Sequence, residues 1–166
     1  YNIGQAKSDG FEADFSLMLT ETWSLTGAAS YIQAELSQDY FKSDGLAAPT
    51  AASGTPLPRV PEVKWNLSTR YGFNTDWFMQ ASYIYTGSSY NNLFDGGSLQ
   101  TKRYKQGDYQ ILNASVGIDR DSWVAEMYVR NLTDERGEVF RNAVNWDDRV
   151  MTNRPRTIGT RVSFRF

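Results

Sequence analysis

The end of the chain alternates between two kinds of side chain in steps of two residues. The first set, which is apolar or threonine, is Ile158, Thr160, Val162, Phe164 and Phe166. The second set is Gly159, Arg161, Ser163 and Arg165. Because successive side chains of a β-strand point to opposite faces, one face of this segment is apolar and the other carries two arginines. Strands of transmembrane barrels alternate in this way over about ten residues, so residues 157–166 predict such a strand.

The same period of two recurs in six earlier segments. These are residues 11–19, 23–36, 63–73, 77–86, 109–118 and 123–132. Short turns lie at residues 20–22, 74–76 and 119–122, and long connections at residues 37–62, 87–108 and 133–156. Outer-membrane barrels have short periplasmic turns and long extracellular loops, whereas a sandwich has no reason to sort its connections by length. We therefore predict an all-β fold: a transmembrane antiparallel β-barrel segment of about seven strands.

Aromatic side chains on the apolar faces gather at the ends of the predicted strands. The set nearest the short turns is Trp23, Phe73, Trp77, Trp123 and Phe166. The set nearest the long connections is Tyr31, Trp65, Tyr83 and Tyr85. Amphipathic aromatic rings are most stable at the boundary between lipid and water. We therefore expect an interface girdle at the short-turn end and a second one opposite it.

The polar faces of the predicted strands carry charged side chains that would face the lumen. These are Glu12, Asp14, Arg70, Glu126, Arg130, Arg161 and Arg165. The most basic cluster is Arg154, Arg156, Arg161 and Arg165. The simplest expectation is that its inward arginines pair with acidic residues such as Glu12, Asp14 and Glu126, and the functional alternative is contact with an anionic ligand or with a domain that fills the lumen. Glu12 and Asp14 also have the spacing of an acid–base pair, but no histidine or nucleophile accompanies them, so solvated lumen positions are favoured.

Residue types that are absent exclude several functions. The chain has no histidine and no cysteine, which removes the commonest general base and the thiol nucleophile. A net charge of −2 gives no indication of nucleic-acid binding. We predict no enzyme activity, no metal site and no cofactor. No apolar run approaches the roughly eighteen residues of a membrane helix, while a mean hydropathy of −0.53 suits barrel strands, which are only half apolar.

Seven strands cannot close a bacterial single-chain barrel, which has an even number. Residues 1–8 have the composition of a short connection and are too few for another strand. Left unpaired, the outermost strands would expose backbone polar groups to lipid, at several kcal/mol per group. The sequence also begins within the alternating pattern and without a signal peptide. We therefore expect residues 1–166 to be the C-terminal portion of a larger barrel.

Five short motifs resemble those of TonB-dependent outer-membrane receptors, and they occur in the same order. They are S-D-G-F-E (residues 8–12), L-P-R-V-P (57–61), Y-T-G-S (85–88), R-N-L-T-D-E (130–135) and R-P-R-T-I-G (154–159), followed by the terminal aromatic Phe166. In the family, the fourth motif follows the penultimate strand and the fifth begins the last one. Together the motifs span nearly all of the chain.

The resemblance implies a barrel of about 22 strands around an N-terminal plug that engages TonB. It also implies a bacterial outer-membrane location and energised uptake of a scarce ligand, such as a ferric siderophore, cobalamin or a glycan. This sequence holds neither the plug nor the earlier strands. The implied partners are outer-membrane lipid, the remaining strands and plug of the same receptor, TonB through that plug, and the barrel-assembly machinery, whose signal would be Phe164 and Phe166.

Aromatic residues in the long connections are candidates for a ligand vestibule: Tyr90, Phe94, Tyr104, Phe140 and Trp146. The same rings could instead pack the loops together, and the sequence favours neither role. Two other functions also remain open at this point. The first is a small autonomous outer-membrane barrel, either an adhesin or a structural protein. The second is a soluble β-sandwich that binds carbohydrate through its loop aromatics.

Overall fold

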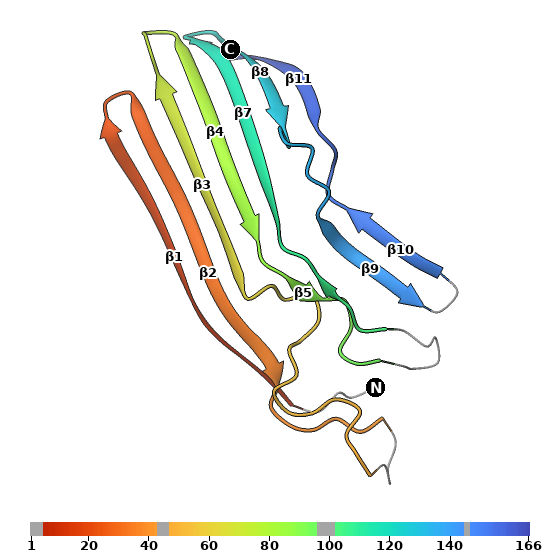
Figure 1. The fold of residues 1–166 in the computed structure, drawn as a ribbon. Helices are drawn as coiled ribbons and strands as arrows, with labels where there is room; N and C mark the ends of the chain where they lie inside the picture. The colour runs from red at the N-terminus through yellow and green to blue at the C-terminus, as the bar shows by residue number, and fades with distance from the viewer. Residues whose placement is uncertain (1–4, 43–46, 96–101, 145–146) are drawn as a thin grey trace.

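One curved antiparallel sheet dominates the computed structural model, which describes residues 5–42, 47–95, 102–144 and 147–166 (Figure 1). Its seven strands are β1 (Ala6–Thr20), β2 (Trp23–Leu36), β3 (Val63–Gly72), β4 (Trp77–Thr86), β7 (Tyr109–Arg120), β8 (Trp123–Arg130) and β11 (Thr157–Phe164). They lie in the order in which they follow one another along the chain, so each large strand pairs with its neighbours in sequence. The seven predicted strands are therefore confirmed.

The register of the sheet keeps the predicted apolar positions on a single face. Residues directly opposite in an antiparallel ladder share a face. One such row crosses six strands through Trp23, Tyr71, Met79, Val116, Met127 and Thr160. The row beside it, on the opposite face, contains Ser24, Arg70, Gln80, Ser115, Tyr128 and Gly159. The period of two thus predicted the face of every residue in these two rows.

The connections are sorted by length, as the sequence predicts. Figure 1 shows the tight turns β1–β2, β3–β4 and β7–β8 at one end of the sheet and the long connections at the other. β11 also ends on the side of the short turns. In an outer-membrane barrel the short turns lie on the periplasmic side, which places the long connections outside.

Several strand boundaries differ from the prediction, and three of them by two residues or more at positions that matter below: the start of β1 and the ends of β7, at Arg120 rather than residue 118, and β8. β1 begins at Ala6 rather than at residue 11, so residues 6–8 belong to a strand and not to a connection. Both faces of residues 6–10 are polar or small, which removed the signal of alternation there. β8 ends at Arg130 rather than at residue 132, because Asn131 takes a left-handed backbone conformation with φ 53°.

Two of the long connections contain strands that the sequence analysis did not predict. The segment 87–108 holds β5 (Ser89–Tyr90) and β6 (Lys105–Gln106), which pair with each other. The segment 133–156 holds a hairpin of β9 (Glu138–Val144) and β10 (Asp147–Thr152). Neither hairpin has one apolar face to bury, and such strands leave no clear period in the sequence.

Among the described residues, the buried apolar side chains lie partly on strands of the large sheet (Ala34, Leu36 and Phe78) and partly in the long connections (Tyr40, Ala51 and Leu93). Leu36, Tyr40, Ala51 and Leu93 form a small cluster at the long-connection end, with Leu57 and Phe94 packed against it. In contrast, side chains on the apolar face of the sheet are open, with exposed fractions of 58% for Met127 and 71% for Ile158. Within the described ranges no second layer covers this face, as it would in a sandwich. The same residues include no helix that is long and apolar enough to cross a bilayer.

Candidate functional site

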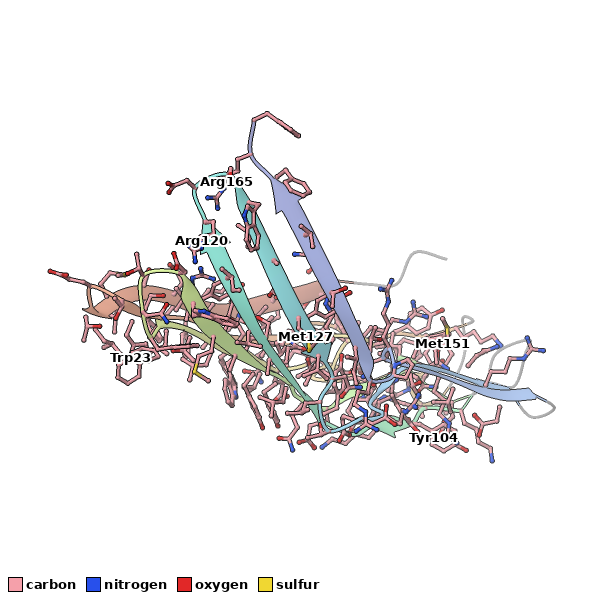
Figure 2. All side chains as sticks on the ribbon, turned by 90° about the horizontal axis from the view of Figure 1, so that it is seen from above. Trp23, Tyr104, Arg120, Met127, Met151 and Arg165 are labelled. Atoms are coloured by element: carbon pink, nitrogen blue, oxygen red, sulfur yellow. The ribbon has the colours of Figure 1, made fainter. Side chains whose placement is uncertain are left out.

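The polar face of the sheet carries an ionic network at the short-turn end. Asp119, on β7, accepts a hydrogen bond from Arg70 at 3.5 Å and another from Arg165 at 3.0 Å. Arg70 lies on β3 and Arg165 follows β11, so Asp119 links strands that are not neighbours. Figure 2 shows Arg165 beside Arg120, whose carbonyl oxygen accepts a further hydrogen bond from Arg165 at 3.3 Å. The network runs across five strands of the sheet, from β3 to β11.

This network corrects the expected partners of the inward arginines. Arg161 does form an ion pair with Glu126, at 3.8 Å. Arg70 and Arg165 instead share Asp119, which the sequence analysis assigned to a turn. β7 continues to Arg120, so the side chain of Asp119 points to the polar face like Ser115.

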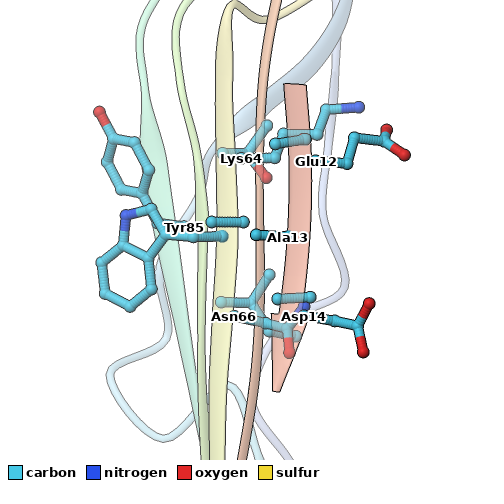
Figure 3. Close-up of a pocket in the computed structure, with 12 residues that line it drawn as sticks. Glu12, Ala13, Asp14, Lys64, Asn66 and Tyr85 are labelled. Atoms are coloured by element: carbon cyan, nitrogen blue, oxygen red, sulfur yellow. The ribbon is translucent and has the colours of Figure 1, made fainter. Parts of the chain in front are cut away.

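Glu12 and Asp14 lie at the other edge of the sheet, on β1. They line a surface cavity of about 430 Å³ together with Lys64 and Asn66. In Figure 3 both acids and Lys64 extend to one side of the sheet, and Tyr85 extends to the other. Neither acid forms an ion pair within the part of the chain that the structure describes.

A smaller polar cavity lies near the middle of the same face. It has a volume of about 190 Å³, and its lining includes Ser82, Asn113, Glu126, Arg130 and Arg161. The guanidinium groups of Arg130 and Arg161 lie 5.2 Å and 6.0 Å from the ring centre of Tyr128. Arg130 forms no ion pair with a described residue, and so it leaves a positive charge on this wall.

The predicted loop aromatics lie in contacts within and between the long connections. Arg59 stacks on Phe140 at 4.3 Å, and Arg141 stacks on Tyr104 at 4.4 Å. The other two contacts are Arg103 over Tyr90, at 3.5 Å, and Phe94 on Tyr40, at 5.6 Å between ring centres. Trp146 lies outside the described residues. These four rings are half-buried, and each has one face covered by a neighbour.

Two buried amides hold these loops together, and the sequence analysis missed both. Asn91 is 1% exposed and donates to the carbonyl oxygens of Lys102 and Arg141, at 3.0 Å and 3.2 Å. Gln106 is 2% exposed and donates to the carbonyl oxygen of Glu138 at 3.3 Å. Both join the second long connection to the third. An amide in a glycine-rich polar segment has no pattern that marks it as buried.

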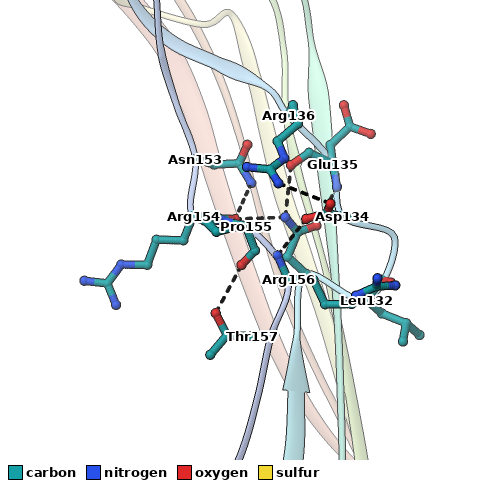
Figure 4. A network of polar contacts seen from close by, with 10 residues as sticks. Leu132, Asp134, Glu135, Arg136, Asn153, Arg154, Pro155, Arg156 and Thr157 are labelled. Atoms are coloured by element: carbon teal, nitrogen blue, oxygen red, sulfur yellow. Dashed lines mark hydrogen bonds and ion pairs between the residues drawn. The ribbon is translucent and has the colours of Figure 1, made fainter.

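The motif at residues 130–135 forms a compact link between β8 and β11 (Figure 4). Asn131 is 3% exposed, and its amide nitrogen donates to the carbonyl oxygens of Glu135 and Arg154, both at 2.9 Å. Asp134 accepts hydrogen bonds from the backbone of Arg156, at 2.8 Å, and from Arg136, at 3.2 Å. The backbone N–H of Arg156 is the main cause that lowers the pKa of the Asp134 carboxyl. The fourth and fifth of the five sequence motifs that carried the resemblance therefore contact each other.

The predicted girdle residues lie on the apolar face at the short-turn end. Trp23 meets Tyr71 edge to face at 6.1 Å, and Phe73 stacks on Trp77 at 6.3 Å. Trp123 lies opposite Phe164 in the ladder. At the other end of the face, Trp65 stacks on Tyr83 and Tyr85, at 5.0 Å and 5.8 Å. Their position at a lipid boundary stays a prediction.

Comparison with known proteins gives a family and a fold. Residues 1–132 match the family model described as TonB dependent receptor-like, beta-barrel. The metal-pseudopaline receptor CntO of Pseudomonas aeruginosa is 29% identical over 153 residues, which cover 78% of this chain and 20% of CntO. The ferric-catecholate import receptor Fiu of E. coli superposes with a TM-score of 0.73 at 20% identity, covering 96% of this chain and 21% of Fiu. The ferric yersiniabactin uptake receptor FyuA of Yersinia pestis has a TM-score of 0.73 at 22% identity, covering 97% and 24%.

The chain spans about a fifth of the length of the curated relatives that it matches. The matched receptors share its antiparallel sheet over nearly the whole chain, which accounts for the single apolar face without a second layer. The family consists of receptors rather than enzymes and resides in the bacterial outer membrane. Since the family model matches more than half of the residues, this chain belongs to the TonB-dependent receptor β-barrel family.

Proposed function

We propose that residues 1–166 form the C-terminal part of the barrel of a receptor that imports a metal–siderophore complex. The observation that carries this proposal is the sheet itself, with one open apolar face, one polar face and long connections at one end. Similarity to receptors named for metal-pseudopaline, ferric catecholate and ferric yersiniabactin supports metal chelates as the ligand class. The plug and the remaining strands of the same receptor would complete the barrel, and TonB would act through that plug.

The polar wall suits an anionic cargo. Arg130 and Arg161 border the central cavity, and Arg130 has no carboxylate partner within the described ranges. A guanidinium without such a partner attracts anionic metal chelates along a lumen, where charge is less screened than in bulk water. The loop aromatics are less suited to a direct contact, because each of the four described rings already packs on a neighbour.

Two further roles belong to this proposal. Trp23, Phe73, Trp77 and Trp123 anchor the barrel at the periplasmic interface, because aromatic rings favour that boundary. Phe164 and Phe166 provide the apolar signal for the barrel-assembly machinery. Phe164 is 65% exposed on the outward face of the edge strand β11, and Phe166, two residues past its end, is exposed as well, so both rings are available to another protein.

The test is uptake of radioactive iron by cells that lack their own siderophore receptors and express the complete receptor. Catecholate, hydroxamate and phenolate siderophores would be supplied in parallel. We expect iron accumulation with at least one of them, and we expect the accumulation to disappear in a strain without TonB. Uptake of cobalamin or a glycan in place of every iron chelate would reject the ligand class. Equal uptake with and without TonB would reject the energised mechanism.

A further inference from the structure

The L-P-R-V-P motif lies in the first long connection, where the chain runs beside the half of β2 that is nearest the long connections. The backbone N–H of Leu57 donates to the carbonyl oxygen of Ala34 at 2.9 Å. Five residues later the carbonyl oxygen of Glu62 accepts a hydrogen bond from the N–H of Ile32, at 2.8 Å. Residues 57 and 62 are thereby both attached to β2, and the residues between them are held away from its edge.

Arg59 lies between these two attachments in an unusual backbone conformation. Its φ is 63°, in the left-handed region that residues other than glycine rarely adopt. Pro58 and Pro61 restrict the chain on both sides, because the proline ring fixes φ. Leu57 packs against the buried cluster at the long-connection end. A strained residue of this kind persists only where its surroundings hold it in place, which makes the contacts of Arg59 informative.

Arg59 contacts both of the other long connections. Its backbone N–H donates to the carbonyl oxygen of Tyr90, on β5, at 2.7 Å. Its guanidinium lies 4.3 Å from the ring centre of Phe140, on β9. Figure 1 shows the segment that leads into β3 passing beside β5. One residue of the first connection therefore joins the second and the third.

Further contacts join the three connections in pairs. Tyr40 of the first connection stacks on Phe94 of the second, at 5.6 Å between ring centres. Asn91 of the second connection is buried and donates to the carbonyl oxygen of Arg141 in the third, at 3.2 Å. The contacts form a closed set, so no connection can move without losing a contact to another. Arg59 is the member of this set that contacts two connections at once.

We propose that Arg59 is a positioning residue that holds the three long connections together as one rigid unit, and that this unit is in place before a ligand arrives. Loops that are ordered in advance lose little conformational freedom when a ligand binds, which favours tight capture. Movement over a bound ligand would then come from the other connections of the complete receptor. The consequence for uptake rests on the proposed function, whereas the rigidity of the unit does not.

The first test measures the distance between spin labels at Ala52 and Val150, in the first and third connections, by pulsed electron paramagnetic resonance. Both positions are exposed, and the sample is the complete receptor without ligand. We expect a narrow distribution of distances, and Arg59→Ala is expected to make it about twofold wider. Lys42→Ala is the control, because it removes a cation of the same connection whose side chain forms no ion pair or ring contact with the described residues. An unchanged width in Arg59→Ala would overturn the proposal.

The contact between Arg59 and Phe140 is tested by a double-mutant cycle on the same distance. Phe140→Leu removes the ring and should widen the distribution as Arg59→Ala does. The double variant should be no wider than either single variant, because the two residues act through one contact. Arg59→Lys keeps a cation that can lie over the ring and should restore part of the narrow distribution. Additive effects of the two single variants would overturn the assignment of rigidity to this pair.

The second test uses the iron chelate that the receptor imports. Arg59→Ala is expected to raise the half-saturating concentration about threefold and to leave the maximal uptake rate within about twofold, because it weakens capture and not transport. Addition of the chelate should move the mean distance between the labels by less than about 2 Å, and a larger shift would overturn a unit formed in advance. All variants must show the same shift on boiling in a cold SDS gel. A receptor that imports no iron chelate would fail the proposed function, while the distances without ligand would still decide this inference.

Discussion

The side-chain amide of Asn131 donates to the carbonyl oxygen of Arg154 at 2.9 Å, across 23 residues of sequence. The bond joins the end of β8 to the segment that leads into β11. Asn131 also exchanges two hydrogen bonds with Glu135, both at 2.9 Å, and its backbone N–H donates to the side chain of Asn113 on β7, at 2.9 Å. One residue with φ 53° therefore connects β7, β8 and β11 where the third long connection leaves the sheet.

Replacing Asn131 by alanine is expected to destabilise the complete receptor by about 3 kcal/mol. The change removes three side-chain hydrogen bonds in a buried position and leaves a non-glycine residue without the amide that supports its left-handed backbone. The free energy of unfolding in urea, measured in lipid vesicles, gives the magnitude. Asn153→Ala is the control, since Asn153 donates a single bond to the same carbonyl, at 3.1 Å. Equal effects of the two substitutions would contradict a special role for Asn131.

Gly117 is expected to tolerate no side chain. It stands opposite Phe78 in the ladder, and an added Cβ would lie 2.5 Å from the Phe78 ring and 2.7 Å from the carbonyl oxygen of Ala125. The ring has no free direction, because Phe78 is 5% exposed and the guanidinium of Arg70 lies 3.6 Å from its centre. Gly117→Ala should therefore lower stability by about 1–3 kcal/mol, through displacement of the ring or of β8.

The same unfolding measurement on Gly107→Ala provides the comparison for Gly117. Nothing lies within 4 Å of a Cβ added at Gly107, so we expect a change within about 0.5 kcal/mol. A Gly117 variant as stable as the Gly107 variant would mean that Phe78 moves aside freely. In that case the contact between the ring and the glycine contributes nothing to the sheet.

Phe78 also illustrates what the sequence could predict. Alternation identified all seven strands and their apolar faces, because a period of two is a direct consequence of strand geometry. Phe78 broke the pattern, because it is a large apolar residue on the polar face. Its position is explained only by the fold, which places the small residue Gly117 directly opposite it. The partner of Arg165 was missed for a similar reason. Asp119 was assigned to a turn, and only the longer β7 brings it to the polar face.

The loops were the least predictable part. β5 and β6 have two residues each, and their position depends on Asn91 and Gln106, whose burial results from contacts with distant residues. The sequence alone did not decide whether the loop aromatics line a ligand vestibule or pack the loops together. The cation–π contacts of Arg59 and Arg141 favour packing for two of these rings, and such pairs are not visible without the fold.

The β9–β10 hairpin is expected to lose order in acid. Arg141 and Asp148 form two hydrogen bonds across it, at 2.9 Å and 2.5 Å. The hydrogen bonds from Arg141 lower the pKa of the Asp148 carboxyl below its ordinary value, despite the opposing effect of desolvation. A lowered pKa in the folded state means that the stabilisation is present above the ordinary pKa of aspartate and is lost as the pH falls through the lowered value.

A spin label at the exposed Val150 would report this change. Its motion should increase as the pH is lowered below the ordinary pKa of aspartate, the range in which the carboxylate becomes protonated, and should change little between neutral pH and that value. Glu138 forms a second ion pair with Arg141, at 3.7 Å, so Asp148→Asn is the necessary control. That variant should be mobile already at neutral pH and respond little to acid. An unchanged acid response in Asp148→Asn would assign the transition to another group.

The 166-residue chain by itself is expected not to form a compact membrane-inserted structure. β1 and β11 are the outermost strands of the sheet, and each pairs with a single neighbour within the described residues. In lipid or detergent their free backbone groups have no water to bind, which costs several kcal/mol per unpaired group over strands of 15 and 8 residues. The open apolar face provides no internal core that could compensate, since the buried cluster lies at the long connections.

Refolded in detergent and run on a cold SDS gel, the chain should give no fast band that shifts on boiling, whereas the complete receptor should give one. A compact, heat-modifiable band from the chain alone would show that the two edges can close on each other, and it would favour an autonomous barrel over a receptor segment.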